Sequence, residues 1–228
     1  MGQELELKLH IDSPAQMEAV RTWQPLRDLT EGAEALLKMQ TTYFDTPDGE
    51  ISSRRWTFRQ RRENDACITC LKTPGRDAGS LKSRKEWETE ESDLQKAVAN
   101  LVRNGAPMEL ASLTSNGVVP LCGAAFVRRA QLLRFSDGST CELACDAGEL
   151  CGGENRLPFY ELELELKSGE KTQMVAFGKR LAQTFGLSVE PMSKFARAKM
   201  LADKSADSTE EEGGESCEAA FQTCIRPV

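Results

Sequence analysis

The sequence contains one histidine, His10, among its 228 residues. A Ser-His-Asp triad or a histidine-rich zinc site would have to be built around that one side chain. We expect His10 to end the first strand instead, so any metal ion is expected to be held by carboxylates.

The sequence also lacks a long apolar run. No stretch approaches the roughly 20 residues that a membrane-spanning helix needs, and the N-terminus, acidic from Glu4 onward, is unlike a signal peptide. We therefore expect a cytoplasmic protein without a membrane partner. Hydrophobic residues make up 39% and charged residues 29% of the chain, which suits a domain that buries a substantial core.

Disulfides are not expected, although the chain has eight cysteines, because nothing indicates secretion. Cys67 and Cys70 have the spacing of half a zinc site or of a redox pair. Their neighbours read as a strand, however, in which positions i and i+3 lie on opposite faces. No second pair of this spacing follows, and Cys141 and Cys145 have no histidine nearby.

Most of the net charge of −7 lies at the C-terminal end of the chain. Residues 203–228 carry seven acidic and two basic residues among serine and glycine, a composition typical of disorder. We predict one domain over residues 1–202 and a disordered acidic tail over 203–228. The folded part is close to neutral, so a general nucleic-acid-binding surface is not expected.

Strict alternation of leucine with charged residues marks two strands, one over residues 3–9 and one over 161–166. Period two puts the charges on one face and the leucines on the other. One such strand is compatible with a solvated edge. Two of them, with basic strands between, favour a closed sheet that faces charges inward to a wet channel and leucines outward under helices.

Basic side chains dominate the strands between these two. In residues 54–62, Arg59 and Arg61 share a face, while Trp56 and Phe58 point the other way. A single-stranded nucleic-acid platform would place aromatic and basic side chains together, so that interpretation is weaker. Residues 82–90 carry two cations and then three glutamates along one face.

Capping and turn signals predict the remaining elements. They are a helix starting near Pro14, a strand over 35–45, a strand over 67–72, a helix from Ser92 to Arg103, loop and short helix over 108–124, a hairpin with strands at about 126–135 and 139–146, a helix over 171–185, and a last helix over 193–202.

Phosphate and metal chemistry would explain why so many charges share one face. Arginine and lysine hold phosphate oxygens, and oxygen-only carboxylate sites suit Mg²⁺ or Mn²⁺. Together they predict metal-assisted phosphoryl transfer, in which the protein positions the substrate and neutralises its charge.

The ordered motifs resemble those of the CYTH superfamily, the triphosphate tunnel metalloenzymes. The chain opens with Glu4-x-Glu6-x-Lys8, the family's ExExK signature. In the same order as the family it then has Tyr43-Phe44-Asp45-Thr46-Pro47, Phe58-Arg59-Gln60-Arg61, Leu71-Lys72, Arg84-x-Glu86, Asp146, Glu161-x-Glu163-x-Glu165 and Ser193-Lys194. The resemblance covers about residues 1–202 and is greatest to bacterial inorganic triphosphatases.

The resemblance implies an α+β fold, an eight-stranded antiparallel β-barrel or tunnel with a charged interior and helices packed outside. It implies catalytic roles for Lys8 and Glu6, with Lys8 also a candidate for orienting the attacking water. The implied phosphate-binding residues are Lys8, Arg59, Arg61, Lys72, Arg84, Arg128 and Lys194. The implied Mg²⁺ or Mn²⁺ ligands are Glu4, Glu6, Asp146, Glu161, Glu163 and Glu165. Ala130 departs from relatives that have a second basic residue after Arg128.

The implied activity is hydrolysis of tripolyphosphate to pyrophosphate and phosphate. Alternatives of the same fold are a thiamine or nucleoside triphosphatase and a class IV adenylyl cyclase. A different class of function is a non-catalytic polyphosphate-binding module, which would act as a partner of a separate CHAD protein. The enzyme and the binding module are both compatible with a monomer or a homodimer. A ligand-free sheet would instead turn its carboxylates to solvent and its leucines inward.

Overall fold

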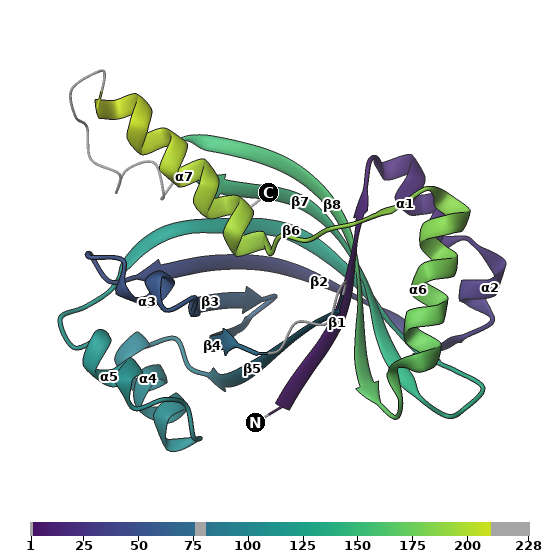
Figure 1. Ribbon diagram of the computed structural model, residues 1–228, viewed down its shortest axis with the longest axis horizontal. Coiled ribbons are helices and arrows are strands. Elements are labelled where there is room, and N and C mark those ends of the chain that lie inside the picture. The colour runs from purple at the N-terminus through teal and green to yellow at the C-terminus, as the bar shows by residue number, and fades with distance from the viewer. Residues whose placement is uncertain (1, 76–80, 211–228) are drawn as a thin grey trace.

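The computed structural model describes residues 2–75 and 81–210, with side chains described for 5–75 and 84–205. Its strands are β1 (Gly2–Ile11), β2 (Thr30–Asp45), β3 (Thr57–Glu63), β4 (Ala66–Pro74), β5 (Leu81–Glu90), β6 (Val119–Arg134), β7 (Thr140–Gly152), β8 (Asn155–Ser168) and β9 (Ser188–Val189). Its helices are α1 (Pro14–Arg21), α2 (Gln24–Arg27), α3 (Glu50–Ser53), α4 (Leu94–Arg103), α5 (Glu109–Leu113), α6 (Lys171–Phe185) and α7 (Lys194–Glu210). The fold is therefore α+β (Figure 1).

One large antiparallel sheet organises the molecule. Its strand order is β5-β4-β3-β2-β6-β7-β8-β1-β9, and β5 also pairs with β1. The expectation of eight strands is corrected to nine in the described residues, because the two-residue β9 lies beside β1, whereas the pairing of β5 with β1 joins the first and last of the other eight strands. The extra strand arises because residues 188 and 189 pair with residues 9 and 10 of β1.

The two alternating strands lie side by side, as the sequence predicts. Lys8 of β1 is opposite Glu163 of β8, and Glu6 is opposite Glu165. On the other face, Leu7 and Leu9 are buried against α1, α2 and α6, for example beside Met174 and Phe177. The leucines therefore lie under helices, and the prediction of inward leucines and solvent-facing carboxylates is wrong.

Two helical layers cover the outside of the sheet. Helices α1, α2 and α6 lie together against β1 and β8, at the right of Figure 1, and α3, α4 and α5 lie near β3, β4 and β5. In the second layer, Leu101 and Leu110 pack with Phe58 of β3 and Trp87 of β5. None of the helices in the described ranges is long and apolar enough to cross a membrane.

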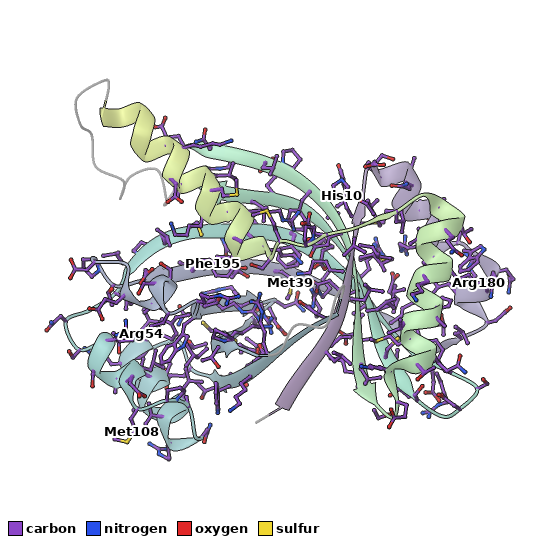
Figure 2. The ribbon with its side chains drawn as sticks, in the orientation of Figure 1. His10, Met39, Arg54, Met108, Arg180 and Phe195 are labelled. Atoms are coloured by element: carbon purple, nitrogen blue, oxygen red, sulfur yellow. The ribbon has the colours of Figure 1, made fainter. Side chains whose placement is uncertain are left out.

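Helix α7 packs on the face of the sheet that carries the charges. Phe195 and Ala198 of α7 join an apolar cluster with Met39 of β2 and Phe126 of β6, and Figure 2 shows Phe195 and Met39 where the helix crosses the sheet. A side chain at Gly152 of β7 would collide with the α7 backbone, because its Cβ would lie 2.3 Å from an amide nitrogen of that helix. Glycine thus lets α7 approach the sheet closely.

Several helices and strands are longer than the sequence predicted. The strand expected at 35–45 begins at Thr30, and β6 begins at Val119 within a segment expected to be loop and short helix. The last helix was expected to end at residue 202 but continues to Glu210, into the segment expected to be disordered. The rest of that segment, residues 211–228, lies outside the described residues. The helix from Lys171 to Phe185 is confirmed.

Candidate active site

A cavity of about 310 Å³ opens on the charged face of the sheet. Strands β1 through β8 all contribute side chains to its wall, and Ser193, Lys194 and Phe195 line it from the start of α7. The charged side chains of the wall are Glu6, Lys8, Arg59, Arg61, Glu63, Lys72, Arg84, Glu86, Glu88, Arg128, Glu142, Glu163, Glu165, Lys167 and Lys194. Charges of both signs thus face one enclosed volume.

Three carboxylates form the innermost acidic group, which consists of Asp146, Glu161 and Glu163. One oxygen from each lies within 4.8 Å of the others. Neighbouring strands create the group, since Asp146 of β7 is opposite Glu161 of β8. Asp146 and Glu161 are fully buried and do not line the cavity, whereas Glu163 does.

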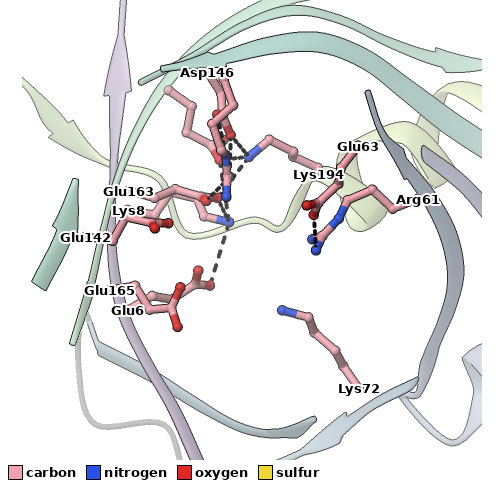
Figure 3. A network of polar contacts seen from close by, with 12 residues as sticks. Glu6, Lys8, Arg61, Glu63, Lys72, Glu142, Asp146, Glu163, Glu165 and Lys194 are labelled. Atoms are coloured by element: carbon pink, nitrogen blue, oxygen red, sulfur yellow. Dashed lines mark hydrogen bonds and ion pairs between the residues drawn. The ribbon is translucent and has the colours of Figure 1, made fainter. Parts of the chain in front are cut away.

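Cations neutralise this acidic group (Figure 3). The Lys194 ammonium lies 2.6 Å from Glu161 Oε1, 2.8 Å from Glu163 Oε1 and 2.8 Å from Asp146 Oδ2. The Lys8 ammonium lies 3.2 Å from Glu163 Oε1 and 3.6 Å from Glu161 Oε1. The Arg128 guanidinium donates two hydrogen bonds to Asp146, at 2.8 and 2.7 Å, and a third to Glu163.

The network holds its lysines in the charged form. Burial acts to lower the pKa of Lys194, but Asp146, Glu161 and Glu163 raise it well above its ordinary value. Burial likewise opposes ionisation of Lys8, and the nearby glutamates again raise its pKa. Both side chains are therefore ammonium ions at neutral pH, which suits them to bind anions and not to accept a proton.

Arg197 completes the network from the end of the first turn of α7. Its guanidinium pairs with Glu161 and lies 3.3 Å from Glu190 Oε2. It was not among the residues that the sequence assigned to the site. Its position three residues after Lys194 is the signal that could have found it, because positions i and i+3 share a helix face.

A second set of carboxylates, the glutamate row, crosses three neighbouring strands. Glu165 of β8 is opposite both Glu6 of β1 and Glu142 of β7, and all three line the cavity. Lys167 lies 2.9 Å from Glu165 and 3.9 Å from Glu142, and Lys8 lies 3.7 Å from Glu6. Among the described side chains, the row has fewer close cations than the acidic group. Glu142 was not assigned a role from the sequence.

The opposite wall comes from β3, β4 and β5 and is basic by a small margin, because four cations face the cavity there with three glutamates. Lys72 and Arg59 lie 3.2 and 3.5 Å from Glu86 Oε1, and Arg61 pairs with Glu63 and Glu88. The Nε atoms of Arg59 and Arg61 are buried without a hydrogen-bond partner. Burial and the neighbouring Arg59 lower the pKa of Arg61, so an added anion would relieve both the unpaired donors and the repulsion.

The thiol of Cys70 lies under this wall and donates to Glu86 at 3.0 Å. Burial raises its pKa to about 12, so it is a neutral donor. Cys67 and Cys70 are both free thiols. The structure therefore shows no disulfide between Cys67 and Cys70.

Glu86 makes part of the stability of this wall depend on pH. Burial opposes its ionisation, but Lys72, Arg59 and the hydrogen bond from Cys70 lower its pKa from 4.5 to about 2. A carboxylate whose pKa is lower in the folded state stabilises the fold above its unfolded pKa, and that contribution disappears as pH falls from about 4.5 toward 2.

We expect Glu86→Gln to lower the free energy of unfolding at pH 7 by roughly 3 kcal/mol. The difference from wild type should shrink as the pH is lowered below about 4.5, and urea unfolding at a series of pH values measures it. Glu90→Gln, at an exposed position of the same strand, is the control and should cost little throughout. If the difference in free energy of unfolding between wild type and Glu86→Gln stays constant down to pH 3, the ion-pair explanation is contradicted.

The structure gathers most of the residues that the sequence singled out. Lining the cavity are Lys8, Arg59, Arg61, Lys72, Arg84, Arg128, Lys194, Glu6, Glu163 and Glu165. Asp146 and Glu161 lie behind the wall, in contact with Lys194. The backbone of Glu4 pairs with that of Arg84, but its side chain lies outside the described residues.

Comparison with known proteins identifies the family. The CYTH domain matches residues 2–198. The chain belongs to the CYTH family. A curated inorganic triphosphatase of Haemophilus influenzae is 30% identical over 204 residues, which are 90% of this chain and 56% of that protein. This chain thus spans little more than half the length of that relative.

Solved structures of other proteins share the CYTH fold. A Hippeastrum protein, described as an adenylyl cyclase candidate with a dominant triphosphatase activity, superposes with a TM-score of 0.56 at 20% identity, covering 86% of this chain and 95% of its own. A protein of Pyrococcus horikoshii gives a TM-score of 0.54 at 20% identity, covering 88% and 99%. At these identities the similarity concerns the fold alone.

Proposed function

We propose that this CYTH protein hydrolyses inorganic triphosphate to pyrophosphate and phosphate, with Mg²⁺ or Mn²⁺ as cofactor. The observation that carries the proposal is one cavity with a basic wall on β3–β5 and acidic groups on β1, β7 and β8. A ligand with several anionic groups can contact the basic wall, while a divalent cation neutralises the facing carboxylates. The 30% identity to an inorganic triphosphatase supports the same reaction.

The phosphate oxygens would be held by the cations that reach the cavity. Arg59 and Arg61 have buried Nε donors without partners, and Lys72 extends from the same wall. Arg84, Arg128, Lys8 and Lys194 also line the volume. Because these side chains come from five strands and a helix, they fix the substrate from several directions, and positioning of this kind accounts for much of phosphoryl-transfer catalysis.

The carboxylates present fit a hard divalent cation, since they provide oxygen ligands only. Glu6 and Glu165 of the glutamate row, together with Glu163, are the members of the assigned set that reach the cavity and would hold it. Asp146 and Glu161 are fully buried against Lys194, so we assign them the role of fixing that lysine. When bound, the metal ion would neutralise charge on the phosphate oxygens.

In the hydrolysis, the oxygen of a water molecule bonds to the terminal phosphorus and the bond to the bridging oxygen breaks. Phosphate and pyrophosphate leave, and the proton of the water passes to solvent or product. Lys8 lies between Glu6 and Glu163, at 3.7 and 3.2 Å, where its ammonium group can orient the reacting oxygen. The charge of Lys8 excludes it as the proton acceptor.

Phosphate release from tripolyphosphate, ATP and thiamine triphosphate tests the proposal. Tripolyphosphate should be the fastest substrate with Mg²⁺ or Mn²⁺, and EDTA should reduce its rate on the order of 100-fold, as expected for loss of a main electrostatic contributor to catalysis. A faster rate with either organic triphosphate would indicate a thiamine or nucleoside triphosphatase. Binding of tripolyphosphate with no release from any substrate would indicate a binding module.

A further inference from the structure

A second cavity, of about 180 Å³, adjoins the first. Thr57, Arg84, Ser193 and Phe195 line both of them, so the two volumes meet at this shared border. Arg55 lines the second cavity and does not line the first. A ligand that fills the larger cavity can therefore extend past Arg84 toward Arg55.

Two arginines, Arg55 and Arg84, line the second cavity, and its described lining includes no carboxylate. In the described part of the chain, no carboxylate pairs with Arg55 or Arg84, although both line this cavity. Arg59, Arg61 and Arg128 of the first cavity each have a carboxylate within ion-pair distance. The described lining of the second cavity therefore has arginines without carboxylates, whereas the first cavity has both.

Local backbone geometry places Arg55 at this border. Its φ of +60° is uncommon for a residue other than glycine, and it lies two residues before the start of β3 at Thr57. The segment is tied to α3 by a hydrogen bond from Arg55 N to Ser52 O at 2.8 Å. The side chain therefore starts from a fixed turn, which limits the positions it can take.

The N-terminus of α7 adds a second element that favours anions. Ser193 and Ala196 both line the second cavity, and the Ser193 hydroxyl accepts a hydrogen bond from Ala196 N at 3.1 Å. The first turn of a helix carries partial positive charge.

We propose that the second cavity is a subsite for the fourth phosphate of a linear polyphosphate whose other three occupy the first cavity. The proposal rests on the proposed function, because it takes the larger cavity as the triphosphate site. Arg55 and Arg84 would hold the additional phosphate at the border. The substrate class then includes polyphosphates longer than tripolyphosphate, and Arg55 determines how well the longer chains bind.

Calorimetric titration with tripolyphosphate and tetrapolyphosphate, in EDTA, tests the subsite without requiring turnover. Arg55→Gln should weaken tetrapolyphosphate binding about tenfold, since a hydrogen bond to a charged group is lost. Tripolyphosphate binding should change less than about twofold, because Arg55 does not line the first cavity. Arg55→Lys should restore part of the loss for tetrapolyphosphate.

Arg54→Gln is the matched control, because this neighbouring arginine is exposed and bound to Glu50. Equal weakening of both ligands by Arg55→Gln, or of neither, would overturn the proposal, as would weakening of ATP binding alone. Phosphate release is measured separately. If no polyphosphate is hydrolysed, the proposed function fails while the titration still decides whether the subsite exists.

Discussion

Lys194→Met is expected to lower the free energy of unfolding by about 3–5 kcal/mol, the range typical when one partner of a buried ion pair is removed. Lys194 is buried, with 7% of the residue exposed. Its ammonium group lies 2.6–2.8 Å from three carboxylates. Methionine has a similar length but no charge, so Asp146 and Glu161 would stay buried with less compensation. For a domain of this size the loss corresponds to roughly 10 °C in Tm.

Urea unfolding followed by circular dichroism measures the effect. Lys199→Met is the control on the same helix, since Lys199 is bound to Asp203 at a more exposed position, and exposed pairs of this kind are worth about 0.5 kcal/mol. A stability for Lys194→Met within 1 kcal/mol of wild type would mean that water or a neighbouring cation replaces the ammonium group. The assignment of Asp146 and Glu161 as its counter-ions would then be wrong.

Glu6→Gln is expected to reduce metal-dependent phosphate release on the order of 100-fold. Glu6 lines the cavity and lies 3.7 Å from Lys8, its closest cation in the described part of the chain. Glutamine keeps the shape and loses the negative charge, which weakens a ligand of Mg²⁺ or Mn²⁺. The fold should tolerate the change, because the one ion pair of Glu6 with a described side chain is long, at 3.7 Å.

Initial rates at increasing Mg²⁺ concentration separate a metal ligand from a structural residue. A lost ligand should raise the Mg²⁺ concentration needed for half-maximal rate, and excess metal should recover part of the activity. Glu149→Gln, an exposed glutamate of β7, should leave the rate unchanged. If Glu6→Gln retains full activity at low Mg²⁺, Glu6 does not hold the metal.

The sequence was most informative where one face of a strand carries a single kind of residue. The alternation in β1 and β8 predicted which side chains face the cavity, because period two leaves no other arrangement once the leucines are buried. It did not predict the ninth strand, since residues 188–189 are too short to show a pattern. Nor did it separate Glu163, which reaches the cavity, from Glu161, which lies behind it, because both share a face.

Composition was misleading at the start of the acidic tail. Residues from Asp203 onward look disordered, yet α7 continues to Glu210. One local and two tertiary contacts explain the start of this extension, since Lys199 pairs with Asp203 within the helix, and the Asn155 side chain of β8 donates to Leu201 O and to Ser205. Such contacts with β8 depend on the tertiary fold, and no window of the sequence contains both partners.

The start of β6 was missed for a related reason. Pro120 and Gly123 interrupt any strand pattern, because proline lacks an amide donor and glycine has no side chain to pack. In the structure a register shift between Tyr43 and Phe44 accommodates this end of β6. This register shift depends on how β2 and β6 pair with each other, so the sequence of β6 alone does not predict it.

The pairing of β1 has a consequence for how the chain reaches its native state. Strand β1 hydrogen-bonds to residues 160–165 of β8, so it has no sheet neighbour on that side until the ribosome has synthesised the chain through β8. Contacts this distant in sequence slow folding, because a large loop must close before they contribute. Nascent chains that stop before β8 would expose this strand, and binding by a chaperone at that stage would protect it from aggregation.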